Sequence, residues 1–161
     1  MEQICEAVIG RLAAAGLEAQ SALPFAAACR VRKPVSSVQM TRWALEGRPV
    51  YLGLMEELEL FGHQLEGTLE LLVHAPKAAE AAATAVQAAS VLVDGIEGVT
   101  LRQVETGAVR YERELDHFVC PVTATVDAWL YAVPRDDGLY FEDFVLRGDL
   151  RSAWKEQEDE T

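Results

Sequence analysis

Hydrophobic and polar residues alternate most regularly in the stretch from residue 64 to residue 75. Gln64, Glu66, Thr68 and Glu70 fill the polar phase of this alternation, and a two-residue period predicts a strand with one buried face. The apolar phase holds Leu65, Leu69, Leu71 and Val73. Pro76 then ends the strand and begins an alanine-rich helix over residues 77–93, because proline is tolerated in a first helical turn and alanine favours helix most. We expect the helix to pack on the sheet through Ala82, Val86, Ala89 and Val93.

Extended structure returns over residues 99–105, 109–112 and 118–131. The last of these stretches alternates along its whole length. Its inward phase is Phe118, Cys120, Val122, Ala124, Val126, Ala128 and Leu130. Its outward phase is Val119, Pro121, Thr123, Thr125, Asp127, Trp129 and Tyr131. An outward row that ends in Trp and Tyr is typical of a protein contact, since both side chains join a large apolar area to a polar group. Cover by the first helix or by the C-terminal segment of the same chain is equally compatible with this pattern.

The N-terminal part of the chain predicts a helix followed by a strand. Ile4, Cys5, Val8, Ile9 and Leu12 recur at helical spacing over residues 1–15, and Gly16 stands where a left-handed C-terminal cap belongs. Residues 34–45 have the composition of a strand, which the turn residues 46–49 end.

Residues 47–62 are interpreted as a long excursion between two antiparallel strands. Excursions of this length in a compact domain are usually functional or oligomeric. The candidate interface residues here are Tyr51, Leu52, Glu56, Glu57 and Glu59.

Together these elements predict an α+β fold. We expect a mixed, largely antiparallel sheet with an N-terminal helix and a central Ala-rich helix packed on one face. Residues 1–132 form a single domain, and residues 133–161 form a C-terminal extension. Within the extension, residues 139–146 are too apolar for a free tail, so Tyr140, Phe141 and Phe144 are expected to cover either their own domain or a neighbouring subunit. The acidic end, residues 155–161, is expected to be flexible.

The charge of the chain narrows the classes of partner. A formal net charge of −12 over 161 residues disfavours nucleic acid as a bound partner and makes copies of the protein repel one another. The first twelve residues carry Glu2 and Glu6 within their apolar pattern, which is wrong for a secretory signal. No uninterrupted apolar run reaches the roughly 18 residues of a membrane span, so we expect a soluble intracellular protein with no membrane partner.

Candidate chemistry is sparse. His63, His74 and His117 stand far apart without HxH or HxxxH spacing, and a structural role is the favoured interpretation of each. The three cysteines show no CxxC spacing, and two of them, Cys5 and Cys120, fall in apolar phases as small buried hydrophobes. No phosphate loop, nucleophile elbow or Cys–His pairing is present. We therefore expect no enzyme, no catalytic residue, no cofactor and no metal site.

The order of elements resembles the tail terminator and tail-completion proteins of long-tailed phages and related prophage tail-like particles. The resemblance covers roughly residues 1–132 and rests on a strand that runs into an alanine-rich helix (LLVHAPKAAEAAA) and on two closing strands (RYERELDHFVCPVTATV). The extension at residues 133–161 and the excursion at residues 47–62 depart from that pattern.

The resemblance implies a structural, head–tail joining protein that is assembled in the bacterial cytoplasm and located in the virion or particle. Such proteins form a ring, typically a hexamer, on the head-proximal end of the tail tube, where they stop tube polymerisation and dock the neck connector. The implied partners are further copies of the chain, the tail tube protein and the connector, while DNA only passes through the lumen. Acidic lumen walls, with Glu56–Glu59 as the candidate cluster, would repel phosphates. A neck adaptor or other tail assembly factor, and a small-molecule-binding α+β domain with a pocket between helix and sheet, remain the alternatives.

Overall fold

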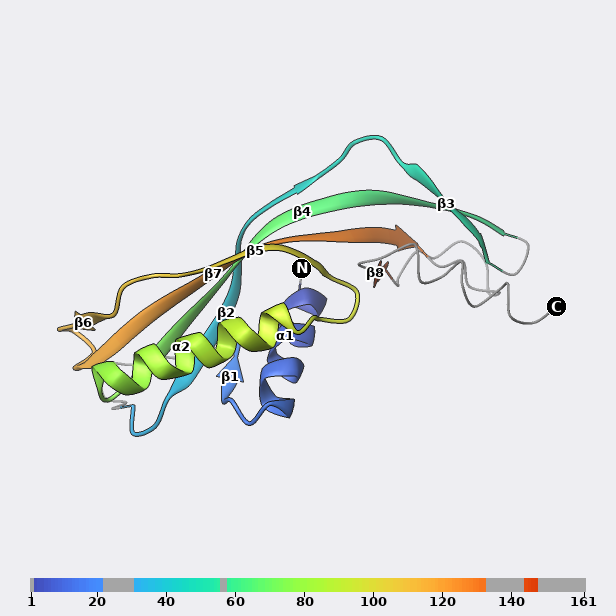
Figure 1. The fold of residues 1–161 in the computed structure, drawn as a ribbon. Helices are drawn as coiled ribbons and strands as arrows, with labels where there is room; N and C mark the ends of the chain where they lie inside the picture. The colour runs from blue at the N-terminus through green and yellow to red at the C-terminus, as the bar shows by residue number, and fades with distance from the viewer. Residues whose placement is uncertain (1, 22–30, 56–57, 133–143, 148–161) are drawn as a thin grey trace.

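A computed structural model describes residues 2–21, 31–55, 58–132 and 144–147 of the chain. They form an α+β fold in which two helices lie on one face of a single, largely antiparallel sheet (Figure 1). The helices are α1 (Glu2–Ala14) and α2 (Ala78–Val93). The strands are β1 (Ala19–Gln20), β2 (Val35–Leu45), β3 (Val50–Met55), β4 (Leu58–Ala75), β5 (Thr100–Thr106), β6 (Arg110–Glu112), β7 (His117–Ala132) and β8 (Phe144–Arg147).

The two longest strands, β4 and β7, form the centre of the sheet. They pair antiparallel without interruption from Gly62↔Tyr131 to Ala75↔Phe118. Strict two-residue alternation explains this length, because each apolar residue of one strand meets an apolar residue of the other on the same face. Leu69 thus lies opposite Ala124, and Leu71 opposite Val122.

The other strands pair along the two outer edges of this central pair. On the far edge of β4, β2 pairs with Leu65–His74 and β3 with Leu58–Gly62, while the two-residue β1 adds to β2 in parallel. On the far edge of β7, three separate segments follow one another: β6, then β5, then β8. Part of the predicted C-terminal docking segment, starting at Phe144, therefore pairs with its own domain.

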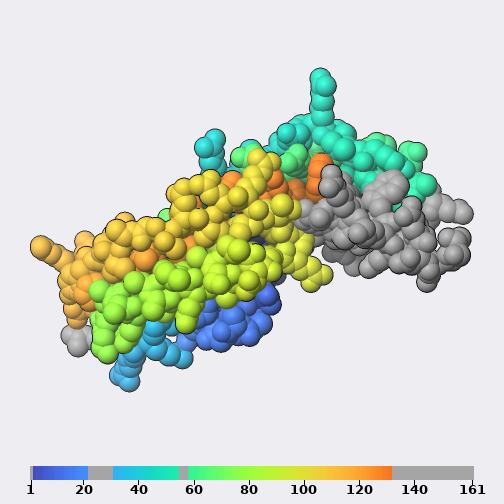
Figure 2. Space-filling model, viewed as in Figure 1, coloured from blue at the N-terminus to red at the C-terminus, as the bar shows by residue number. Residues whose placement is uncertain are grey.

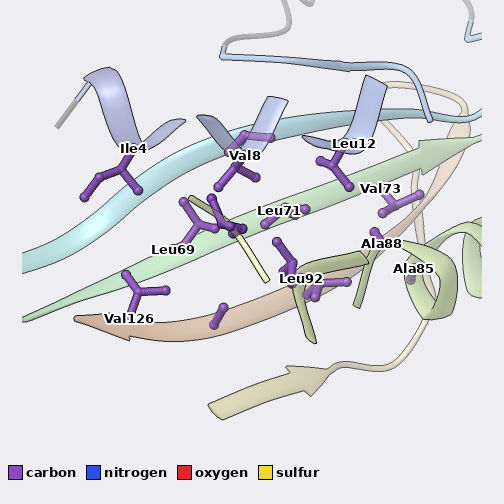
Figure 3. Packing of buried hydrophobic residues seen from close by; sticks show 14 of the residues in the cluster. Ile4, Val8, Leu12, Leu69, Leu71, Val73, Ala85, Ala88, Leu92 and Val126 are labelled. Atoms are coloured by element: carbon purple, nitrogen blue, oxygen red, sulfur yellow. The ribbon is translucent and has the colours of Figure 1, made fainter. Parts of the chain in front are cut away.

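The core fills the space between the helices and the sheet. Figure 3 shows Ile4, Val8 and Leu12 of α1 pointing into the same cluster as the apolar phases of β4 and β7. The predicted α1 seam and the left-handed cap are confirmed, since Ile4, Val8 and Leu12 are fully buried and Gly16 has a φ of 79°.

The predicted packing face of α2 is wrong by about one position. Its buried residues are Ala81, Thr84, Ala85, Ala88 and Leu92. Val86 and Val93, which were expected in the seam, are instead 63% and 67% exposed. An almost uniformly apolar helix carries no contrast between its faces, so periodicity alone does not orient it.

The long excursion predicted for residues 47–62 is also wrong in form. Residues 46–49 do not reverse the chain; β3 continues along the same edge of β4 that β2 occupies, and Met55 pairs with Leu58. The segment is therefore a β-hairpin that extends the sheet beyond both helices (Figure 1).

Leu71→Ala is expected to lower the free energy of unfolding by about 2–5 kcal/mol, because it leaves a cavity between β4, β7 and the helices. Its neighbour Leu72 is only half-buried and faces the opposite side, so Leu72→Ala is a matched control with a smaller loss. Urea denaturation of both variants measures the difference. Equal midpoints for the two variants would contradict the assignment of the core to the helix-covered face.

Candidate interaction surface

The distal part of the sheet, residues 43–65, is here called the hairpin arm. It comprises the end of β2, all of β3 and the start of β4, and it extends beyond the ends of α1 and α2 (Figure 1). Two hydrogen bonds fix the backbone at the junction between β2 and β3. The backbone N–H of Glu46 donates to the Gln64 oxygen at 2.8 Å, and the Nδ1–H of His63 donates to the Glu46 oxygen at 2.7 Å. These contacts keep β3 in line with β2.

One face of the hairpin arm carries a row of exposed apolar side chains. Residues that pair directly across two strands share a face, and alternate residues of one strand share it too. The pairs Trp43↔Gly67, Leu45↔Leu65, Tyr51↔Phe61 and Leu54↔Glu59 therefore place five apolar residues on the face that the helices cover farther along the sheet. We call Trp43, Leu45, Tyr51, Leu54 and Phe61 the apolar row.

The apolar row is open to solvent. Its side chains are between 40% exposed, at Leu45, and 58% exposed, at Leu54. Tyr51 and Phe61 contact each other edge to face, with ring centroids 5.6 Å apart. Val50 and Leu58 add further exposed apolar area to the same arm. Monomeric proteins seldom expose contiguous apolar surface of this kind unless a partner covers it.

On the opposite face of the arm, a β-bulge in β3 leads to burial of the side chains. The pairing shifts between Tyr51 and Gly53, so Leu52 is the extra residue, and its side chain folds over Gly62. Leu52 is 8% exposed, and Tyr131, which pairs with Gly62 from β7, is 5% exposed. Gly62 leaves room for Leu52 because it has no Cβ.

The residues predicted to form an interface differ in how exposed they are in the structure. Tyr51 and Glu59 are exposed on the arm, whereas Leu52 and Tyr131 are buried within the chain. Trp129 is half-buried. Phe144 lies in β8 opposite Ala132. Glu56, Glu57, Tyr140 and Phe141, and the acidic end predicted to be flexible, lie outside the described residues.

Sequence reasoning missed Trp43, Leu45 and Phe61 as surface residues. Apolar side chains alternate with other residues within residues 43–45 and 58–65. Without the register of β3 on β4, however, this alternation could not be assigned to one face of the sheet. The pairing supplies that register.

A second feature lies at the other end of the sheet, where two histidines form a buried pair. Sequence analysis did not detect this pair, because His74 and His117 belong to different strands. His74 pairs in register with Val119, and His117 lies two residues before Val119 on the same face. Their side chains are 3% and 1% exposed, respectively.

The hydrogen bonds of the pair assign its protons. The Nδ1–H of His117 donates to the Leu115 oxygen at 3.1 Å, since a carbonyl oxygen only accepts. In its uncharged form His117 then accepts at Nε2, and the Nδ1–H of His74 donates to it at 2.9 Å. Burial, and then the nearby His117, lowers the pKa of His74 from 6.5 to about 4.

His74 of the pair borders an open hollow of about 480 Å³ on the sheet face opposite the helices. Ser37, Gln39 and Leu72 form its floor, and Arg110, Glu112 and Glu114 reach into it from β6 and the following turn. Arg110 is engaged with Glu112, whose Oε2 lies 3.6 Å from the arginine Nε. The hollow mixes both signs of charge with hydroxyl and amide groups.

The remainder of this sheet face is polar. Asp127 of β7 accepts from the Nε–H of Arg102 on β5, and Glu66 of β4 lies 4.0 Å from the same guanidinium. Glu70 accepts from the Gln39 amide at 2.8 Å. Exposed pairs of this kind contribute little stability, so their main effect is to give the face an acidic, hydrated surface.

Stability is expected to fall as the pH drops from about 6.5 towards 4. The pKa of His74 is lower in the folded than in the unfolded chain, so between these pH values the unfolded chain binds the proton and is stabilised relative to the folded chain. The stabilisation from neutral His74 is complete above about pH 6.5, and its loss amounts to at most about 3 kcal/mol.

Denaturation midpoints measured at pH 7.5 and pH 4.5 test this expectation. His74→Gln should flatten the profile, whereas His63→Gln, outside the pair, should retain it. An unchanged profile in His74→Gln would assign the acid sensitivity to other groups.

Among the described residues, neither helix combines the length and the apolar composition that crossing a lipid bilayer requires. No group of three or more His, Cys, Asp or Glu side chains placed to hold a metal ion occurs within the described ranges. Comparison of the chain with known protein families and with curated protein sequences finds no match.

Proposed function

We propose that this protein is a structural assembly subunit of the phage tail-terminator type. In this proposal it forms a ring on the head-proximal end of a phage or phage-like tail tube, stops tube growth and docks the neck connector. The observation that carries the proposal is the apolar row, because it lies on an arm that the protein's own helices do not cover. The order of the elements, which resembles the tail-terminator proteins, supplies the biological context.

The net charge of the chain supports an assembly that is held together by apolar contacts. Copies that each carry −12 repel one another, so stable association needs a surface where burial outweighs that repulsion. The five side chains of the apolar row offer such a surface at one end of the sheet. An extended arm that contacts a different region of its neighbour makes a head-to-tail interface, and a repeated head-to-tail interface gives a ring where the rotation between copies closes.

The acidic sheet face supports passage of DNA without retention. Glu66, Glu70 and Asp127 leave this face with carboxylates that Arg102 only partly offsets. A lumen wall of this chemistry would repel phosphates. We propose this face as the surface nearest the DNA path.

The same apolar row would also serve a neck adaptor. Identifying the binding partner therefore distinguishes the tail-terminator role from the neck-adaptor role. Immobilised protein is expected to retain the tail tube protein of its own particle and to shorten tubes that polymerise in its presence, as seen by negative-stain microscopy. Retention of the connector alone, with tube lengths unchanged, would instead assign the neck-adaptor role.

Tyr51→Lys and Phe61→Lys are expected to reduce self-association at least tenfold, because each places a charge within the apolar row. Tyr111→Lys is a matched control, since Tyr111 is 49% exposed on β6 at the opposite end of the sheet, against 47% for Tyr51. Light scattering after size exclusion gives the solution mass, and negative-stain images of the same peak give the shape.

Rings that persist in both arm variants would remove the apolar row as the ring contact. Loss of rings in Tyr111→Lys as well would point to a general effect of added charge.

A further inference from the structure

The buried histidine pair lies beside β6 and the turn that follows it, here called the β6 segment (residues 110–116). β6 pairs with residues 117–119 at the start of β7. Figure 2 shows this part of the chain, in gold and orange, at the end of the molecule opposite the hairpin arm. His74 and His117 lie on the sheet face that the helices leave uncovered, so their burial depends on packing against the β6 segment.

The pair is the middle of a chain of hydrogen bonds that ends on the β6 segment. The Nδ1–H of His74 donates to Nε2 of His117 at 2.9 Å, and the Nδ1–H of His117 donates to the Leu115 oxygen at 3.1 Å. His117 therefore accepts at one ring nitrogen and donates at the other, which only an uncharged imidazole can do. The β6 segment is thus bound to β4 through the lone pair of one imidazole nitrogen.

Added protons weaken this chain of hydrogen bonds in two steps. A first proton leaves the N–H···N bond intact, because one of the two facing nitrogens still accepts. It places a positive charge, however, between side chains that are 3% and 1% exposed, where loss of hydration disfavours charge. A second proton puts an N–H on both facing nitrogens and removes the acceptor. Each step is relieved when the β6 segment moves away and water reaches the imidazoles.

The surrounding charges do little to stabilise a buried imidazolium. β2 supplies only uncharged side chains to the adjoining hollow. Within the β6 segment, Glu112 is paired with Arg110, and Asp116 accepts from a tyrosine hydroxyl of the same segment at 2.6 Å. Arg113 and Glu114 are exposed, so water screens their charges. Further charged residues at this end of the sheet are engaged with other side chains: Glu70 on β4, the pair Glu18 and Lys33, and the pair Lys77 and Glu80.

We propose that the histidine pair is a proton-sensitive latch that holds the β6 segment on the sheet, and that acid releases this segment while β4 and β7 stay paired. Release leaves residues 117–119 of β7 without their partner strand, and a free strand edge can accept a strand from another chain. The lowered pKa of His74 agrees with this latch, since between about pH 6.5 and 4 the released state binds a proton that the closed state excludes. The latch lies at the other end of the sheet from the apolar row and does not depend on the proposed function.

Amide hydrogen exchange followed by NMR tests for local release. Between pH 7.5 and pH 5.0 the opening constant of the β6 segment should rise roughly 30-fold, as the shift in the pKa of His74 requires. At pH 5.0 the protection factors of the segment should also be about tenfold lower, or less still, than those of residues 68–72, which pair with β7 at the centre of the sheet. Equal protection of the two regions would overturn the proposal, because it would show that the pair opens only with the whole fold.

Two variants separate the latch from other effects of acid. His74→Gln keeps a side-chain N–H that can donate to His117 but removes one titrating group, so the pH dependence of the β6 segment should shrink to about fivefold or less. Tyr111→Phe removes only the hydroxyl that bonds Asp116, so protection should fall at both pH values while their ratio persists. A His74→Gln protein that retains the full ratio would overturn the latch.

The ring nitrogens of the unmodified protein give a second test that needs no variant. At pH 7.5, the imidazole nitrogen chemical shifts should show His117 protonated at Nδ1 and unprotonated at Nε2. Protonation of His117 at Nε2 instead would overturn the chain of hydrogen bonds and the latch with it.

Discussion

The unbroken pairing of β4 with β7 is the constraint on which the rest of this structure depends. Fourteen consecutive residue pairs fix which residues face the helices and which face solvent. A shift of one residue would exchange the two faces along the whole length, so the buried leucines and valines allow one register only. The core under α1 and α2, the histidine pair and the position of the hairpin arm all follow from that register.

The sequence predicted the parts of the fold that depend on strong local contrast. Alternation around Leu69 and Leu71 located β4, helical spacing of Ile4, Val8 and Leu12 located α1, and both were confirmed. It did not orient α2, where alanine and valine occupy every side. Nor did it identify the His74–His117 pair, because that contact joins residues 43 positions apart through the register of two strands.

The candidate interaction surface was likewise predicted only in part. Tyr51 was identified correctly as exposed, but Leu52 was not, because a bulge at that position turns its side chain onto Gly62. Tyr131 was expected to point outward from the sheet, and it does lie on the face opposite the helices. It is nevertheless buried, since the strand that pairs beyond it and the folded-over Leu52 enclose that end. Register and irregularities in pairing, rather than residue preference, decided each of these outcomes.

The outer edge of β7 is divided among three short segments rather than one long strand. β6 covers Glu112 to Arg110 opposite residues 117–119, β5 covers residues 122–127, and β8 covers residues 129–132. Each of these three strands has its own connections to the rest of the chain, so it can separate from β7 while the other two stay paired. Amide hydrogens of β7 should therefore exchange with solvent in three blocks of different protection, with the four-residue β8 opening at lower free energy than the seven-residue β5. Such a graded edge lets one end of the sheet rearrange while the β4–β7 register stays intact.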